Sequence, residues 1–89
     1  MRAVVTVMGI DRKGIIARVS TCLSENNINI LDINQTIMKD LFTMVMSVDM
    51  SDAENNFAAV SKELSQIGEE MGLEIRIQHE DIFRSMHRI

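Results

Sequence analysis

The residues best suited to chemistry lie in one short loop, Gly9 to Ile16, which reads GIDRKGII and precedes an amphipathic segment. Gly14 permits close backbone approach and unusual dihedral angles. Unpaired N–H groups at the start of the following helix, together with its dipole, favour a bound carboxylate. Asp11 can pair with an ammonium group, and Arg12 can grip a carboxylate through two hydrogen bonds. The alternative is that Asp11 only caps the helix and Arg12 is solvated.

The other residue types that carry chemistry have structural interpretations. Cys22 is the single cysteine and lies on an apolar helical stripe, which favours a small buried hydrophobe over a redox or CxxC metal site. His79 and His87 are the two histidines. A metal cluster of His79 with its acidic neighbours is disfavoured because adjacent ligands on one segment rarely complete a coordination sphere. The sequence therefore predicts no catalytic set, no metal site and no cofactor.

Composition narrows the class of protein. The chain has 89 residues, of which 46% are apolar and 3% aromatic, so we expect a single domain over 1–89 with an aliphatic, methionine-containing core. The net charge of −4 and the lack of a basic cluster exclude a nucleic-acid footprint. Apolar runs are too short for a membrane span or a signal peptide. One cysteine fits a reducing compartment, so we expect a cytoplasmic location.

Hydrophobic periodicity predicts six elements before a C-terminal extension. Alternating or continuous β-branched runs predict strands, and apolar residues at helical spacing predict helices. In chain order these are a strand over Ala3–Met8, a helix over Ile15–Glu25, strands over Ile28–Met38 and Leu41–Met50, a helix over Phe57–Met71 and a strand over Leu73–Gln78.

Several local signals set the boundaries and faces of these elements. Asn26 and Asn27 end the first helix, Gly72 ends the second, and Ser51 with Glu54 forms a capping box before it. Simple alternation places one set of second-strand residues on one face (Leu31, Ile33 and Ile37) and another set on the opposite face (Ile30 and Met38).

The order β-α-β-β-α-β predicts an α+β, ferredoxin-like fold: a four-stranded antiparallel sheet with two helices on one face. The core spans 1–79, and the extension 80–89 predicts a short terminal helix with apolar groups at Ile82, Phe83, Met86 and Ile89. The face away from the helices carries Leu41, Thr43 and Val45, which indicates an interface. Alternatively, the terminal helix folds back over that face.

The loop and the strand order together resemble those of the ACT domain family, over residues 1–79. The resemblance rests on GIDRKGII directly after the first strand, on Asn29-Ile30 at the entry of the second, and on the following Asp32-Ile33-Asn34-Gln35-Thr36. It is greatest to small free-standing bacterial and archaeal members. One departure is Lys13, where many relatives have proline, so the loop is less rigid here.

The resemblance implies a regulatory module that binds a small ligand, often an amino acid, and that is not an enzyme. It implies a homodimer or higher homo-oligomer in which the partner's second strand closes the site, and a regulated partner protein that responds to it. The positions it assigns to ligand binding are Asp11, Arg12, Lys13, Gly14, Ile15, Asn29, Ile30 and Asp32. The alternative is an oligomerisation or protein-interaction domain without a small ligand.

Overall fold

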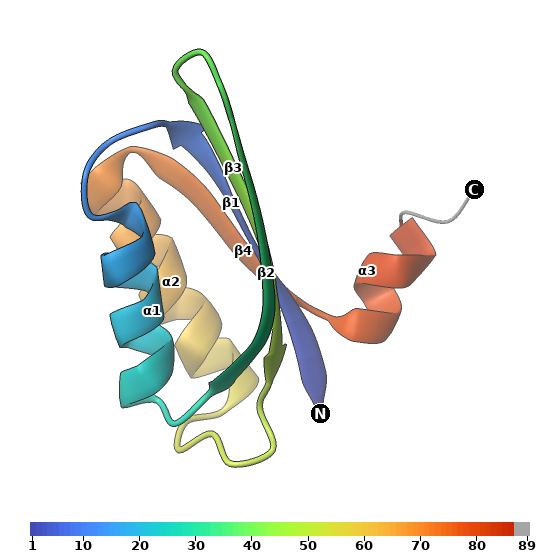
Figure 1. Cartoon of the computed structure of the whole chain (residues 1–89). Helices are drawn as coiled ribbons and strands as arrows, with labels where there is room; N and C mark the ends of the chain where they lie inside the picture. Colours follow the sequence, from blue (N-terminus) through green and yellow to red (C-terminus); the bar gives the residue numbers. More distant parts are fainter. Residues whose placement is uncertain (87–89) are drawn as a thin grey trace.

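The computed structural model describes residues 1–86 and has the element order predicted from the sequence. Its elements are β1 (Arg2–Ile10), α1 (Ile15–Glu25), β2 (Asn29–Met38), β3 (Leu41–Asp49), α2 (Phe57–Met71), β4 (Leu73–His79) and α3 (Glu80–Met86). Helices α1 and α2 lie together on one side of the sheet, and α3 lies on the other (Figure 1). The ferredoxin-like fold is thereby confirmed. Within residues 1–86, no helix is long and apolar enough to cross a membrane.

The four strands are hydrogen-bonded in the order β2-β3-β1-β4, and every neighbouring pair is antiparallel. The strict alternation predicted for β3 is confirmed, because Phe42, Met44 and Met46 are buried beneath the helices. Residues directly opposite one another in a ladder share a face. Thr43 and Val45 alternate along β3 with these buried residues, so their side chains lie on the side of the sheet away from the helices, which we call the open face. The core fills the space between the sheet and the two helices.

The second strand departs from simple alternation. Ile30 pairs with Val48 and Asp32 with Ser47, so Leu31 is an extra residue in a β-bulge. The bulge shifts the side-chain alternation, so that Ile30 joins the helix side of the sheet together with Ile33. The predicted separation of Ile30 from Ile33 was therefore wrong, because a bulge changes the face without changing the residue types.

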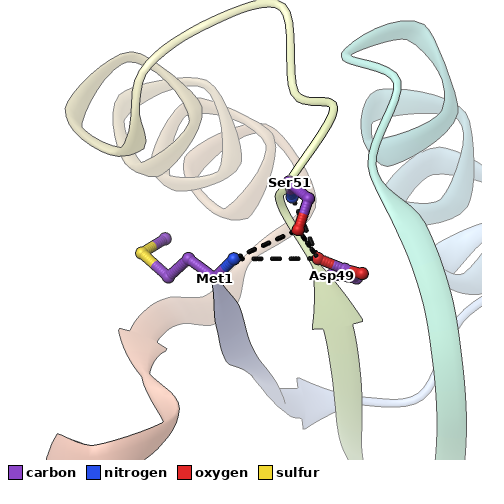
Figure 2. Close-up of polar contacts among 3 residues, drawn as sticks. All are labelled: Met1, Asp49 and Ser51. Atoms are coloured by element: carbon purple, nitrogen blue, oxygen red, sulfur yellow. Dashed lines mark hydrogen bonds and ion pairs between the residues drawn. The ribbon is translucent and has the colours of Figure 1, made fainter.

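The predicted capping box before α2 was also wrong. The helix starts at Phe57, and its cap is Asn56, whose side chain accepts a hydrogen bond from the Ala59 N–H at 2.8 Å. Ser51 instead donates through Oγ to Asp49 at 2.6 Å and accepts from the Met1 ammonium at 3.2 Å (Figure 2). Asp49 accepts hydrogen bonds from both the Ser51 hydroxyl and the Ser51 N–H, and these lower the pKa of its carboxyl below the ordinary value.

The end of α1 is held by a buried polar side chain. Asn26 is 3% exposed, and its amide donates to the Cys22 carbonyl at 2.8 Å and to the Glu63 carboxylate at 3.0 Å. Its side-chain oxygen accepts from Asn55 at 2.6 Å. The next residue, Asn27, has φ of 57°, in the left-handed conformation predicted for the helix end. One side chain thus joins α1, α2 and the loop before α2.

Helix α3 lies over the open face but does not close it. It packs against β1 and β4 at the end of the sheet where β4 finishes (Figure 1). Val4 is on the open face and is buried there, whereas Met8 on the same strand is 50% exposed. The terminal helix therefore covers part of this face, and the interface expected there stays a prediction. The terminal helix is confirmed over 80–86, and the expected contribution of Ile89 lies outside the described residues.

Candidate functional site

The loop before α1 has a fixed backbone geometry. Gly14 precedes the helix with φ of 89°, a left-handed conformation that side chains disfavour. The first intrahelical hydrogen bond runs from the Arg18 N–H to the Gly14 carbonyl at 2.9 Å, so the preceding N–H groups of the first turn are not used within α1. The Asp11 N–H donates to the Asp40 carbonyl at 2.7 Å. This bond ties the loop to the β2–β3 hairpin.

A pocket of about 250 Å³ lies between this loop and the hairpin, on the helix side of the sheet. It brings together four of the predicted site residues (Asp11, Arg12, Gly14 and Ile15) and five that the prediction missed (Ile16, Ala17, Gln35, Ile37 and Phe42). Charged and backbone polar groups therefore line one side of the pocket, and aliphatic and aromatic side chains line the other. Such a pairing suits a small molecule with a polar head and an apolar tail.

The two basic residues of the loop are placed differently. Arg12 lines the pocket, but its guanidinium donates to the Met71 carbonyl at the end of α2, at 3.4 Å. A cation there is favoured by the negative end of the α2 dipole. The neighbouring ion pair between Arg18 and Glu70 also joins α1 to α2. Lys13 lies exposed on the turn that leads into Gly14.

The predicted residues of the second strand lie at the opposite end of the molecule from the loop. Asn29 and Ile30 line a different pocket of about 370 Å³, together with residues from α1 and the loops beside it: Ser20, Ser24, Asn27, Ile28 and Asp52. Asp32 faces the open side, opposite Ser47, and accepts a hydrogen bond from the Ile33 N–H at 2.9 Å. Within a single chain, the predicted site residues therefore form two separate groups, one in the loop before α1 and one in β2.

The missed pocket residues were only partly accessible to sequence reasoning. The β3 alternation already placed Phe42 on the helix side, and β2 alternation placed Ile37 with Ile33. The hairpin register then sets Ile37 opposite Phe42 and Gln35 opposite Met44. What brings them over the loop is the Asp11–Asp40 hydrogen bond, which depends on tertiary structure.

Cys22 is buried, with 3% of its surface exposed. Burial raises the pKa of its thiol to about 12, and the negative charge of Glu63 acts in the same direction. The reactive thiolate is thereby suppressed, as expected for a structural cysteine. Within the described part of the chain, no group of three or more His, Cys, Asp or Glu residues is placed to hold a metal ion.

The raised pKa of Cys22 predicts a loss of stability in alkali. The unfolded thiol ionises near 9.0, whereas the folded thiol keeps its proton up to about pH 12. Between these values the unfolded chain binds fewer protons, so the free energy of unfolding falls as pH rises. We expect wild type to lose about 1 kcal/mol more than Cys22→Ala between pH 8.5 and 10, measured by urea denaturation. Parallel pH profiles for the two proteins would contradict this assignment.

The comparisons with known proteins agree with this architecture. Residues 2–78 match the ACT domain family. A UPF0237 protein of Methanocaldococcus jannaschii is 58% identical over 88 residues, which cover 99% of this chain and 98% of that protein. An ACT domain protein from Streptococcus pneumoniae is 38% identical with a TM-score of 0.80, and the match covers 93% of each chain. The chain belongs to the ACT domain family.

More distant solved structures share the fold. The regulatory subunit of aspartate kinase from Thermus thermophilus has a TM-score of 0.66 at 24% identity, over 86% of this chain and 50% of that one. At this identity the likeness establishes the fold alone. The relation to UPF0237 proteins, by contrast, extends over nearly the whole of both chains.

Proposed function

We propose that the chain is a regulatory module, not an enzyme, that binds a small aliphatic amino acid as a homodimer. The observation that carries this proposal is the pocket of about 250 Å³, in which the Asp11–Gly14 loop faces an apolar wall from β2 and β3. Membership of the ACT family supports the regulatory role. The partner is a protein that responds to the ligand-bound dimer, with no part for nucleic acid or membrane.

The lining of the pocket favours an aliphatic ligand. Ile16 and Ile37 line it and are 40% and 49% exposed, so each has apolar surface that a ligand can cover. Covering such surface stabilises a complex by roughly 25 cal/mol per Å². The ligand carboxylate is assigned to the free N–H groups at the start of α1, and the ammonium to Asp11. Gln35 supplies an amide that can hydrogen-bond either group.

The homodimer is proposed to form through β2. This strand is at the edge of the sheet, and nine of its ten residues are exposed. A free edge of this length is a template for pairing with another strand. Antiparallel pairing of two β2 strands about a two-fold axis brings Asn29 of the partner subunit to the Met38 end of β2, close to the pocket. This arrangement unites the two groups of predicted residues, which one chain keeps apart.

A thermal-shift series tests ligand binding. Valine, leucine or isoleucine at about 100 times its dissociation constant should stabilise the fold by roughly 2.7 kcal/mol, which raises Tm by about 10 °C or more. Glutamate and lysine should have little effect, because their charged side chains would meet the apolar wall. Asp11→Asn should remove most of the shift by removing the partner of the ammonium group.

The matched control is Asp81→Asn on α3, which makes the same chemical change on the other side of the sheet and should keep the full shift. If no amino acid raises Tm while the protein remains dimeric, the chain is an oligomerisation module without a ligand. A shift of equal size for wild type and Asp11→Asn would place the ligand elsewhere.

A further inference from the structure

A groove of about 500 Å³ lies between α3 and the open face of the sheet. Its floor comes from β1, β3 and β4, and Phe83 of α3 forms one wall. The strand residues that line it include Thr6, Met8, Val45, Glu74 and Arg76. A volume of this size is within the range of small-molecule sites, about 300–1,000 Å³. The groove is on the opposite side of the sheet from the pocket beside the loop before α1, so the two are separate.

Glu74 and Arg76 form an ion pair on the β4 side of the groove. Both side chains are on the open face, because Ile75 between them is buried beneath the helices. The Arg76 guanidinium donates to the Glu74 carboxylate at 2.6 Å, and the two side chains are 64% and 61% exposed. An ion pair this exposed contributes little to stability, so it can open at little cost when a ligand enters. A carboxylate and a guanidinium then face the groove from one strand.

Apolar and hydroxyl groups complete the groove beside the ion pair. In the strand register, Met8 lies opposite Glu74 and is 50% exposed. Thr6 lies opposite Arg76 and carries a hydroxyl that can donate or accept a hydrogen bond. The half-buried ring of Phe83 is the wall on the α3 side. Methionine sulfur and aromatic rings both make favourable contacts with a flat ring, so this part of the groove suits a planar ligand.

We propose that this groove binds the base of a free guanine nucleoside. Guanine carries two adjacent N–H donors, at N1 and N2, which match the two oxygens of the Glu74 carboxylate. Its next edge carries the acceptors O6 and N7, which a guanidinium binds through two hydrogen bonds. These two edges adjoin one another, as Glu74 and Arg76 do at about 6.8 Å along one strand. The face of the base packs against Phe83, since bases stack on aromatic side chains.

The order of donors and acceptors disfavours the other purines. Adenine has an acceptor at N1 and a donor at N6, so its N1 lone pair would face the Glu74 carboxylate and its amino group would face Arg76. Hypoxanthine keeps N1–H, O6 and N7 but lacks the 2-amino group, so one carboxylate oxygen loses its partner. A polynucleotide is disfavoured as the source of the base, because the chain has a net charge of −4 and Arg76 is already neutralised by Glu74.

Isothermal titration calorimetry of the full chain with guanosine, inosine and adenosine tests the proposal. Guanosine should bind, inosine should bind at least about tenfold more weakly, and adenosine should give no measurable heat. Glu74→Gln replaces one acceptor oxygen with an amide donor and should weaken guanosine binding at least about tenfold. Arg76→Lys keeps the charge but loses the planar fork of donors, and should have an effect of similar size. Phe83→Leu keeps an apolar side chain without the ring and should cost at least about fivefold.

The controls separate this groove from the amino-acid pocket. Glu69→Gln makes the same chemical change as Glu74→Gln at an exposed position of α2, on the other side of the sheet, and should bind guanosine as wild type does. Circular dichroism checks that each variant is folded. In NMR spectra, guanosine should move the amide signals of Met8 and Arg76 and leave those of the loop 11–14 in place.

Four results would overturn the proposal. They are no guanosine binding by wild type, equal affinities for the three nucleosides, full guanosine affinity in Glu74→Gln and Arg76→Lys, and amide signals that move in the loop 11–14 instead of the groove. A short guanosine-containing oligoribonucleotide should bind no more tightly than guanosine. Tighter binding of the oligoribonucleotide would show that the ligand is RNA and not a free nucleoside.

Discussion

Asn26→Ala is expected to lower the free energy of unfolding by about 3 kcal/mol, because it removes the buried amide that joins α1 to α2. The Glu63 carboxylate then loses its donor at 3.0 Å and Asn55 loses its acceptor at 2.6 Å. A domain of this size is stable by only roughly 5–13 kcal/mol, so the change is a large fraction of the total. Urea denaturation at pH 7 measures it.

Asn26→Asp distinguishes the loss of the hydrogen-bond donor from the loss of side-chain volume. The new carboxylate would lie against Glu63 and could not donate to the Cys22 carbonyl, so at pH 7 we expect a greater loss than with alanine. The repulsion raises the folded pKa of the acid pair, so stability relative to wild type should recover as pH falls towards 4. Asn55→Ala, which removes only the outer hydrogen bond, should cost less than about 1 kcal/mol. Equal losses for all three variants at every pH would contradict the proposed role of the amide.

Gly68→Ala should destabilise the protein by about 2 kcal/mol, although alanine is the better helix former by about 1 kcal/mol. A Cβ atom at position 68 would lie 2.6 Å from the Leu73 carbonyl oxygen, which belongs to the backbone of β4 and cannot rotate away. Helix α2 must therefore move off the strand to accept the methyl group. Thermal and urea unfolding of the variant measure the cost.

Ser65→Ala is the control for this prediction, since it adds the same good helix former at an exposed position of the same helix. It should be neutral or slightly stabilising. A Gly68→Ala protein more stable than wild type would show that helix propensity dominates and that the contact between α2 and β4 is looser than 2.6 Å implies.

The parts of the fold that could be predicted from the sequence are the elements that pack against the core through a single face, because that contact determines which of their residues are apolar. The β3 strand and helix α2 pack one face against the core, so their apolar periods of two and 3.6 are unbroken. The β2 strand lies at an edge of the sheet, where solvent accepts polar residues on both faces of the strand. Its bulge at Leu31 therefore could not be predicted from the pattern of residue types. The cap of α2 was predicted wrongly because the Ser51 side chain hydrogen-bonds to Asp49 instead of to the start of the helix.

The candidate site divides in the same way. The left-handed Gly14 and the free first turn of α1 follow from local chemistry, and the sequence predicted them. Gln35 and Ile37 reach the pocket through strand register and a loop-to-hairpin bond, which no local pattern encodes. Asn29, Ile30 and Asp32 do not reach the pocket even in the folded chain. Their predicted role requires a second molecule.

The two outer strands of the sheet also determine whether the proposed assembly through β2 is closed or open-ended. Both β2 and β4 have a free edge, and joining β2 of one molecule to β4 of the next would repeat without limit and build a filament. Pairing β2 with another β2 uses identical edges and closes after two molecules. The β4 strand is shorter, at seven residues against ten, and carries Glu74 and Arg76. Short, charged edges resist strand addition, so the sheet favours a closed assembly over a fibre.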